Sequence, residues 1–304
     1  MVFPGQGSQS VGMQAELATE FAVVQETYAE ASDILGYDLW ALVQKGPAEE
    51  LAETVVTQPA MLTAGTAAYR VWQAAGGAAP AQVAGHSLGE YTALVAAESL
   101  SFADAMTVVI RRSQLMRDAV PAGVGAMAAI IGLDDAGVIA ACDEASSIGI
   151  AEPVNFNSPG QVVVAGHREA IDNTIERCEA AGARRAILLP VSVPAHSSLM
   201  IKAGEDLQEA LAAANISAPS IKVIAATDGE AYADADDIRS RLSRQVYSPV
   251  HWVATINAII AGGASSIVEC GPGKVLAGLC RRIDRGTPAT FIDSMDSLQK
   301  SLLA

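Results

Sequence analysis

Short apolar runs alternate with amphipathic stretches along most of the chain, and this alternation predicts strands and helices in turn. Ser101 stands at the start of one helical stretch with Asp104 three residues later, the spacing of a capping box. The strand candidates are residues 81–85 and 266–270, and the helix candidates are residues 88–98, 101–118 and 274–282. We therefore expect an α/β architecture with a parallel sheet.

The middle of the chain has an element order of its own. Its predicted elements are a strand at residues 126–131, a helix at 134–145, strands at 150–155 and 161–165, a helix at 168–181 and a strand at 185–189. The Asn-Ser-Pro-Gly segment at residues 157–160 is a strong turn signal between the two central strands. This β-α-β-β-α-β order is typical of a ferredoxin-like unit. We predict such a small domain at residues 119–200, inserted into a large α/β domain made of residues 1–118 and 201–304.

The segment Gly-His-Ser-Leu-Gly at residues 85–89 is the strongest chemical signal. It follows a predicted strand and opens a predicted helix, which is the context that a nucleophile elbow requires. The tight turn would project the Ser87 hydroxyl outward, and the backbone N–H of Leu88 would point toward the same space and could receive an oxyanion. Such five-residue patterns also arise by chance in loops, but the strand–helix context favours a nucleophile.

A serine nucleophile needs a base, and the chain offers four histidines. His86 adjoins the serine and is expected to point away from it, whereas His167 and His251 stand at helix starts that favour solvated, capping or packed roles. His196 follows a short apolar strand candidate, residues 191–193, which breaks at Pro194 near the predicted domain junction. Sites often form at such junctions, so His196 is the preferred base. The aspartates between Ser87 and His196 all look like helix caps or helix surface, so a carbonyl could orient the imidazole instead.

Other candidate motifs leave alternatives open. The glycine-rich loop at residues 3–9 lacks the dinucleotide fingerprint, because Ser10 occupies the next required glycine position. It is either a turn only or the source of a second oxyanion N–H. The segment at residues 271–274 lacks the remaining parts of a phosphate-binding Walker motif. The Arg111-Arg112 pair marks either a solvated helix face or an arginine that binds a substrate carboxylate.

Composition narrows the class of protein further. Hydrophobic residues make up 51% of the 304-residue chain and charged residues only 17%, which excludes a disordered chain. The formal net charge of −15 argues against nucleic acid or an anionic membrane as the main partner. No apolar stretch is long enough to suggest a membrane span or a leader. The four cysteines lack metal-ligand spacing and favour reduced, buried thiols in a cytoplasmic protein: Cys142, Cys178, Cys270 and Cys280.

Taken in order, the motifs resemble the malonyl-CoA:acyl-carrier-protein transacylases of bacterial fatty-acid synthesis, an acyltransferase family. The resemblance covers essentially the whole chain and rests on residues 3–9, 85–90, 155–159, 194–196 and 269–274, together with Arg112 and Gln245. It implies a hydrolase-like α/β core with a parallel sheet plus an inserted ferredoxin-like small domain, in agreement with the element order. The segment before the residue 3–9 loop is shorter than is usual in the family, so the first strand is expected to be weak.

The resemblance also implies a role for individual residues. Ser87 corresponds to the nucleophile that becomes a malonyl ester, and His196 to the general base that later acts as the acid. Gln245 corresponds to the residue whose backbone carbonyl holds the imidazole, which would account for the missing aspartate. Gln6 and Leu88 correspond to the backbone oxyanion donors.

Arg112 corresponds to the clamp on the free malonyl carboxylate. The implied reaction is a two-step transfer from malonyl-CoA to the phosphopantetheine thiol of acyl carrier protein. It requires no metal and no redox cofactor, because CoA and phosphopantetheine enter as substrates. Nucleic acid and membranes are not expected as partners.

Two other functions remain alternatives. A serine thioesterase or esterase would share the elbow, and a non-catalytic module could bind the carrier protein without turnover. An acidic carrier protein would also need a local basic surface on a chain of net charge −15. The cations in and beside the last predicted helix, Lys274, Arg281, Arg282 and Arg285, form either that surface or a solvated helix face.

Overall fold

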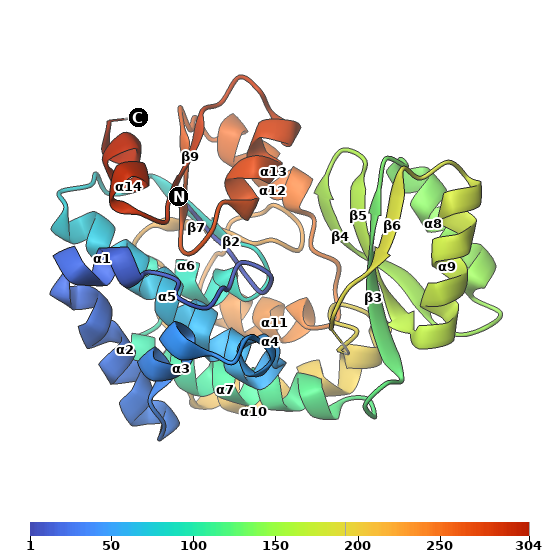
Figure 1. The fold of residues 1–304 in the computed structure, drawn as a ribbon, viewed down its shortest axis with the longest axis horizontal. Helices are drawn as coiled ribbons and strands as arrows, with labels where there is room; N and C mark the ends of the chain where they lie inside the picture. Colours follow the sequence, from blue (N-terminus) through green and yellow to red (C-terminus); the bar gives the residue numbers. More distant parts are fainter. Residues whose placement is uncertain (192, 304) are drawn as a thin grey trace.

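Two β-sheets organise the chain in the computed structural model, which describes residues 1–191 and 193–303 (Figure 1). The larger sheet has five strands in the order β7-β2-β1-β8-β9, and its strand pairs are parallel. Its strands are β1 (Val2–Phe3), β2 (Gln82–Gly85), β7 (Lys222–Ile224), β8 (Ile267–Cys270) and β9 (Ala289–Ile292). β1 has only two residues, yet both are fully buried and β1 pairs with strands on both sides.

Helices cover both faces of the large sheet, as parallel sheets require. Successive strand residues point into opposite cores, so that Phe3 joins the larger core and Val2 the smaller one. The larger core is covered by α1 (Ala15–Glu20), α2 (Ala22–Leu35), α3 (Leu39–Lys45), α4 (Ala48–Ala52), α5 (Thr54–Ala74), α6 (Gly89–Ala96), α7 (Phe102–Asp118), α10 (Ile201–Ala213), α11 (Ala235–Gln245) and α14 (Met295–Leu302). The smaller core is covered by α12 (Trp252–Ala261) and α13 (Val275–Ile283).

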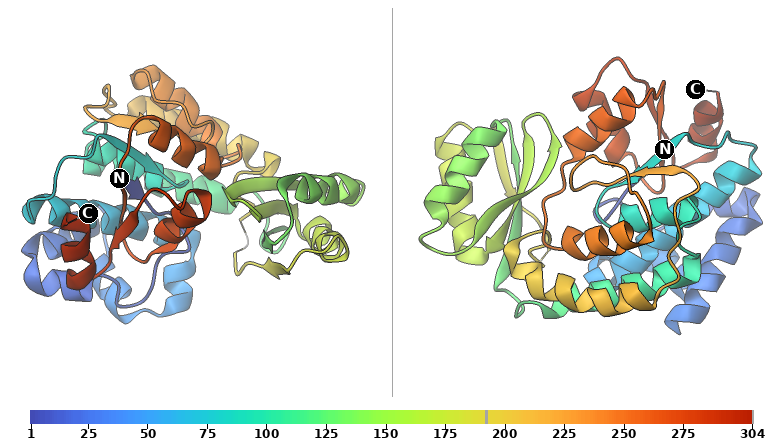
Figure 2. Two further views of the ribbon diagram at one scale, coloured as in Figure 1. Left: turned by 90° about the horizontal axis from the view of Figure 1, so that it is seen from above. Right: turned by 180° about the vertical axis from the view of Figure 1, so that it is seen from behind.

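The second sheet is antiparallel and has the strand order β4-β5-β3-β6. Its elements are β3 (Gly125–Ile131), α8 (Asp135–Ala145), β4 (Ala151–Ser158), β5 (Gln161–His167), α9 (Arg168–Ala180) and β6 (Arg185–Leu188). The two helices lie on the side of this sheet that faces away from the large sheet (Figures 1 and 2). The predicted α/β fold with a ferredoxin-like βαββαβ unit is confirmed. All four strands lie within residues 119–200, although the domain limits themselves stay a prediction.

Two predicted details of the small sheet and its exit are wrong. β4 does not end at residue 155 but continues to Ser158, because Phe156 still pairs with β5 and also donates its N–H to the carbonyl of Val250 at 2.8 Å. The turn is therefore limited to residues 159–160. The strand expected before His196 is absent from the described residues of that segment, since Pro194 has no N–H for a ladder and His196 lies in a turn. Ser192, which belongs to this expected strand, lies outside the described residues.

No described helix combines the length and apolar character that crossing a membrane requires. The 3₁₀ helix η1 (Ser198–Met200) leads the chain from the small sheet back to α10. His196 thus lies on the segment that connects the small sheet to α10, and Ser87 follows β2, an inner strand of the large sheet.

Candidate active site

Ser87 lies on a sharp turn between β2 and α6, as a nucleophile elbow requires. Its backbone has a φ of 52°, in the left-handed region that is strained for a residue with a side chain. The flanking glycines make the turn possible. A Cβ at Gly85 would lie 1.9 Å from the carbonyl carbon of Gly89, and one at Gly89 would lie 2.1 Å from the carbonyl oxygen of Phe3. These two glycines therefore permit the close backbone contacts that place Ser87 just beyond the end of β2.

The imidazole of His196 joins Ser87 to a backbone carbonyl. The Oγ atom of Ser87 lies 2.8 Å from Nε2 of His196, and Nδ1 lies 2.8 Å from the carbonyl oxygen of Gln245. A carbonyl only accepts, so Nδ1 carries the proton and Nε2 is free to accept the serine proton. Of the alternatives for orienting the imidazole, the structure contains the carbonyl.

The environment of His196 keeps the ring neutral. Only 4% of the residue is exposed. Burial, and after it the positive charge of Arg112, lowers the pKa of His196 to about 3. A neutral imidazole at physiological pH is the form that can take a proton from a hydroxyl.

The Arg111-Arg112 pair divides into one solvated and one buried residue. Arg111 is exposed, whereas Arg112 on α7 is only 2% exposed and reaches the site. Its Nη2 donates to Oε1 of Gln245 at 3.0 Å and to Ser87 Oγ at 3.3 Å. Its Nη1 donates to Oε1 of Gln58 at 2.5 Å.

None of the ion pairs formed by the described residues involves Arg112. Its Nε is also buried without a hydrogen-bond partner among them. Its hydrogen bonds all go to neutral oxygens, and its guanidinium lies 5.7 Å from the ring centroid of Tyr91, so it keeps its positive charge and has spare donors. The arrangement can therefore bind an anionic group beside the serine hydroxyl.

The glycine-rich loop at residues 3–9 packs against the elbow. A Cβ added to Gly5 would lie 2.5 Å from the carbonyl oxygen of His86 and 3.6 Å from the backbone N of Leu88. Leu88 is the N-cap of α6, and Gln6 follows Gly5 in an exposed turn. Neither N–H donates a hydrogen bond within the described part of the chain. Two unused backbone donors near one hydroxyl can stabilise an oxyanion.

The other three histidines have partners elsewhere. His86 Nε2 lies 2.7 Å from Oδ1 of Asn157 on β4, a contact that joins the two sheets beside the elbow. His167 Nδ1 accepts from the N–H of Ile150, and His251 stacks on Phe156 with an interplanar angle of 8°.

Two residues of the site have no role in the sequence prediction. Gln58 on α5 is buried and contacts Arg112, but a glutamine within a long buried helix carries no local mark of where it points. Glu90 belongs to the quoted motif at residues 85–90 and is fully buried behind Ser87. Glu90 is the one charged residue of α6, and this isolation within an otherwise uncharged helix is the sequence signal that could have indicated its burial.

The model of the acyl transferase domain family matches residues 1–295. This chain belongs to the acyl transferase family. The malonyl CoA-acyl carrier protein transacylase of Escherichia coli (strain K12) is 52% identical to this acyl transferase over 301 residues, which cover 99% of this chain and 97% of the relative. The corresponding protein of Bacillus subtilis (strain 168) is 39% identical over 99% of this chain and 95% of its own length. The predicted resemblance is confirmed.

Solved structures agree with this family membership. An acyl carrier protein S-malonyltransferase from Vibrio cholerae superposes on this acyl transferase with a TM-score of 0.95, at 51% identity over 98% of both chains. A malonyl-transacylase in complex with its type II PKS acyl-carrier protein superposes with a TM-score of 0.98, at 50% identity over 100% of this chain and 98% of the other.

Proposed function

We propose that this acyl transferase moves a malonyl group from malonyl-CoA to the phosphopantetheine thiol of an acyl carrier protein. One observation carries the substrate class: the buried guanidinium of Arg112 has no carboxylate partner among the described residues and lies 3.3 Å from the Ser87 hydroxyl. A malonyl thioester has a free carboxylate close to the reacting carbonyl, so it can place the carboxylate at Arg112 and the carbonyl at the Ser87 hydroxyl. The close relatives named as malonyl transacylases support the same assignment.

In the first half-reaction, His196 Nε2 takes the proton of Ser87 as Oγ attacks the thioester carbonyl. The backbone N–H groups of Gln6 and Leu88 stabilise the negative oxygen, while the Gln245 carbonyl stabilises the imidazolium. The C–S bond then breaks, and the CoA sulfur leaves with the proton from His196. A malonyl ester on Ser87 remains.

In the second half-reaction, the carrier's thiol replaces CoA. His196 takes the thiol proton, the sulfur attacks the ester carbonyl, and the same backbone donors stabilise the oxyanion. The C–O bond to Ser87 breaks, and Oγ recovers the proton from His196. The product is a malonyl carrier thioester, the extender unit for fatty-acid synthesis.

The basic surface predicted for the carrier protein is exposed. Lys274, Arg281, Arg282 and Arg285 lie on or beside α13, and none of them forms an ion pair with a described carboxylate. A Cβ at Gly273 would lie 3.6 Å from the carbonyl oxygen of Ser8, so this surface adjoins the loop that contains Gln6. We propose that it attracts the acidic carrier protein.

All four cysteines are free and buried, which suits the reducing cytoplasm in which we place the enzyme.

A transfer assay distinguishes this function from the two alternatives. With malonyl-CoA and holo carrier protein, we expect CoA release to match malonyl-carrier formation, with the parallel double-reciprocal lines of ping-pong kinetics. Free malonate as the main product would indicate a thioesterase. Carrier binding without any burst of CoA would indicate a non-catalytic module.

A further inference from the structure

Glu90 is a fully buried carboxyl group directly behind the nucleophile, and the reaction steps above do not use it. Its Oε1 accepts from the hydroxyl of Tyr232 at 2.6 Å and from the N–H of Ala226 at 3.4 Å. Its Oε2 accepts from Nε2 of Gln245 at 2.5 Å. Burial raises the pKa of this carboxyl group, whereas the hydrogen bonds from Tyr232, Gln245 and the N–H of Ala226 act in the opposite direction and favour the ionised form.

The side-chain amide of Gln245 has both ends occupied. Its Nε2 donates to Glu90 and to the carbonyl oxygen of Ser87, the latter at 2.9 Å. Its Oε1 accepts from Nη2 of Arg112 at 3.0 Å. A flipped amide would place its NH₂ group against the guanidinium donors and its oxygen against two acceptors, so only one orientation satisfies all three neighbours.

Of the two acceptors on the nitrogen side, Glu90 is the charged one and therefore the stronger. The result is a chain of groups from carboxylate through amide to guanidinium, in which the negative end fixes the direction of the amide. A buried charge at one end and a buried cation at the other make each hydrogen bond between them stronger than it would be in water.

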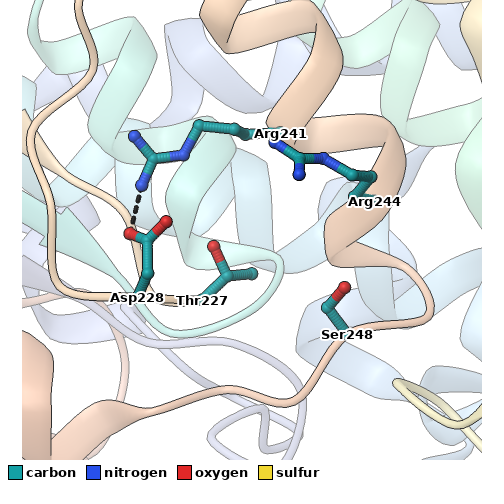
Figure 3. A pocket seen from close by; sticks show the side chains of 5 residues that line it. All are labelled: Thr227, Asp228, Arg241, Arg244 and Ser248. Carbon is teal, nitrogen blue, oxygen red and sulfur yellow. Dashed lines mark hydrogen bonds and ion pairs between the residues drawn. The ribbon is translucent and has the colours of Figure 1, made fainter.

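A second cation close to the partners of Glu90, Arg241, has carboxylate partners of its own. The guanidinium of Arg241 lies 4.8 Å from the ring centroid of Tyr232 and pairs with Asp228 and Asp237. Figure 3 shows Arg241 and Asp228 in the wall of a cavity of about 190 Å³. Glu90 itself forms no ion pair within the described residues, and the Gln245 amide connects it to Arg112 by hydrogen bonds.

We propose that Glu90 is a positioning residue that fixes the Gln245 amide and thereby aims the Arg112 guanidinium at the free carboxylate of the acyl group. The inference rests on the proposed function and gives a residue that never touches the acyl donor a part in the selectivity that Arg112 provides. Its effect must therefore depend on the presence of Arg112.

The test is the isosteric variant Glu90→Gln in the full-length enzyme, alone and combined with Arg112→Ala. A neutral amide at position 90 weakens the hydrogen bond that holds the Gln245 side chain, so that only the Ser87 carbonyl and the Arg112 guanidinium still orient it. We expect kcat/KM for malonyl-CoA to fall about tenfold or more, mainly through KM, while kcat/KM for acetyl-CoA changes less than about threefold. In the Arg112→Ala background, Glu90→Gln should lower kcat/KM for malonyl-CoA by less than about twofold. Equal losses for both donors, or an equal loss without Arg112, would overturn the proposal.

Tyr232→Phe is the matched control, because it removes one hydrogen bond to Glu90 and leaves the contact with Gln245 intact. It should lower stability without changing the ratio of malonyl to acetyl transfer, and a changed ratio would count against the Gln245 route. If Glu90→Gln does not fold, Glu90→Asp replaces it, since its shorter side chain also loses the Gln245 contact. Formation of malonyl-serine tests the proposed function separately. If malonyl-serine forms but Glu90→Gln keeps its selectivity, this inference fails and the proposed function stands.

Discussion

A serine hydroxyl is a weak nucleophile by itself, and in the proposed mechanism the neighbours of Ser87 make it reactive. The neutral imidazole at 2.8 Å can take its proton, and the guanidinium at 3.3 Å can hold the far end of an acyl group. Both neighbours are nearly inaccessible to water, so their electrostatic interactions with a substrate are weakly screened.

Arg112→Ala should change which donor is used. Loss of a charge-assisted contact costs about 1.5–3 kcal/mol, which corresponds to a roughly 10- to 150-fold loss of kcat/KM for malonyl-CoA. Acetyl-CoA has no free carboxylate, so the ratio of its kcat/KM to that of malonyl-CoA should rise. The measurement is transfer to carrier protein from each donor, and an unchanged ratio would contradict the clamp.

The acylation rate should depend little on pH in the range where histidines usually titrate. Protonation of the His196 base abolishes proton uptake, and burial places the pKa of this ring at about 3, below the ordinary value of 6.5. Lowering the pH from 8 to about 5 should therefore leave the base neutral and the burst of CoA release unchanged. Stopped-flow measurement of that burst would contradict the assignment if it showed a fall centred near pH 6.5.

Individual site residues differ in how far the sequence predicts them. Ser87 is predictable because its signal is local and lies between a strand and a helix. The sequence pattern alone does not decide the roles of Arg112 and of the N–H in the residue 3–9 loop, because these roles depend on segments that are far apart in the chain and meet only in the folded protein. Gln58 lies 54 residues from its partner Arg112, and only the packing of α5 against α7 brings the two together.

At the scale of elements, the elbow depends on close backbone contacts at Gly85 and Gly89 that a residue with a side chain would not permit. α6 begins where the backbone of Gly89 meets the carbonyl oxygen of Phe3, so β1 and the elbow lock each other in place. The short first strand is accordingly held by its position between β2 and β8 and not by its length.

Gly89→Ala should destabilise the fold by about 1–3 kcal/mol or more, because the added carbon would overlap backbone that cannot move away. Acylation of Ser87 should fall with it. Gly278→Ala on α13 is the matched control, since nothing lies within 4 Å of its added Cβ. That change should stabilise the helix by about 0.5–1 kcal/mol. Thermal unfolding of the two variants would contradict this account if both shifted in the same direction.

Helix starts with polar caps are the elements that the sequence predicts best. Ser101 accepts from the N–H of Asp104 and caps α7, and Asp134 accepts from Gly137 and caps α8, so both helices begin within one residue of expectation. Strand ends are predicted less well, because pairing with distant chain decides them. β4 is extended by Val250, which lies far along the sequence.

At the scale of the whole molecule, the net charge of −15 opposes an acidic partner, so the placement of the few cations matters. Arg282 donates to Gln161 on β5 and Arg281 to the carbonyl of Ala289, so these two also tie parts of the fold together. Lys274 and Arg285 form no polar side-chain contact within the described residues, which leaves them available to a partner.

Charge reversal at Lys274 and Arg285 should raise KM for the carrier protein about tenfold, with greater loss at low salt, where exposed charges are least screened. The burst of CoA release from malonyl-CoA alone should stay within about twofold, because that half-reaction does not involve the carrier. Steady-state kinetics with varied carrier protein, set beside single-turnover acylation, measures both effects. Equal losses in the two half-reactions would show that this surface does not act in binding the carrier protein.

The central claim is that a dicarboxylic acyl group is carried on the hydroxyl of Ser87. Intact-protein mass spectrometry after brief exposure to malonyl-CoA, followed by peptide mapping, tests it most directly. We expect one malonyl adduct, located on Ser87, that disappears when holo carrier protein is added and never forms on the Ser87→Ala variant. An adduct on any other residue, or undiminished transfer by Ser87→Ala, would contradict the account.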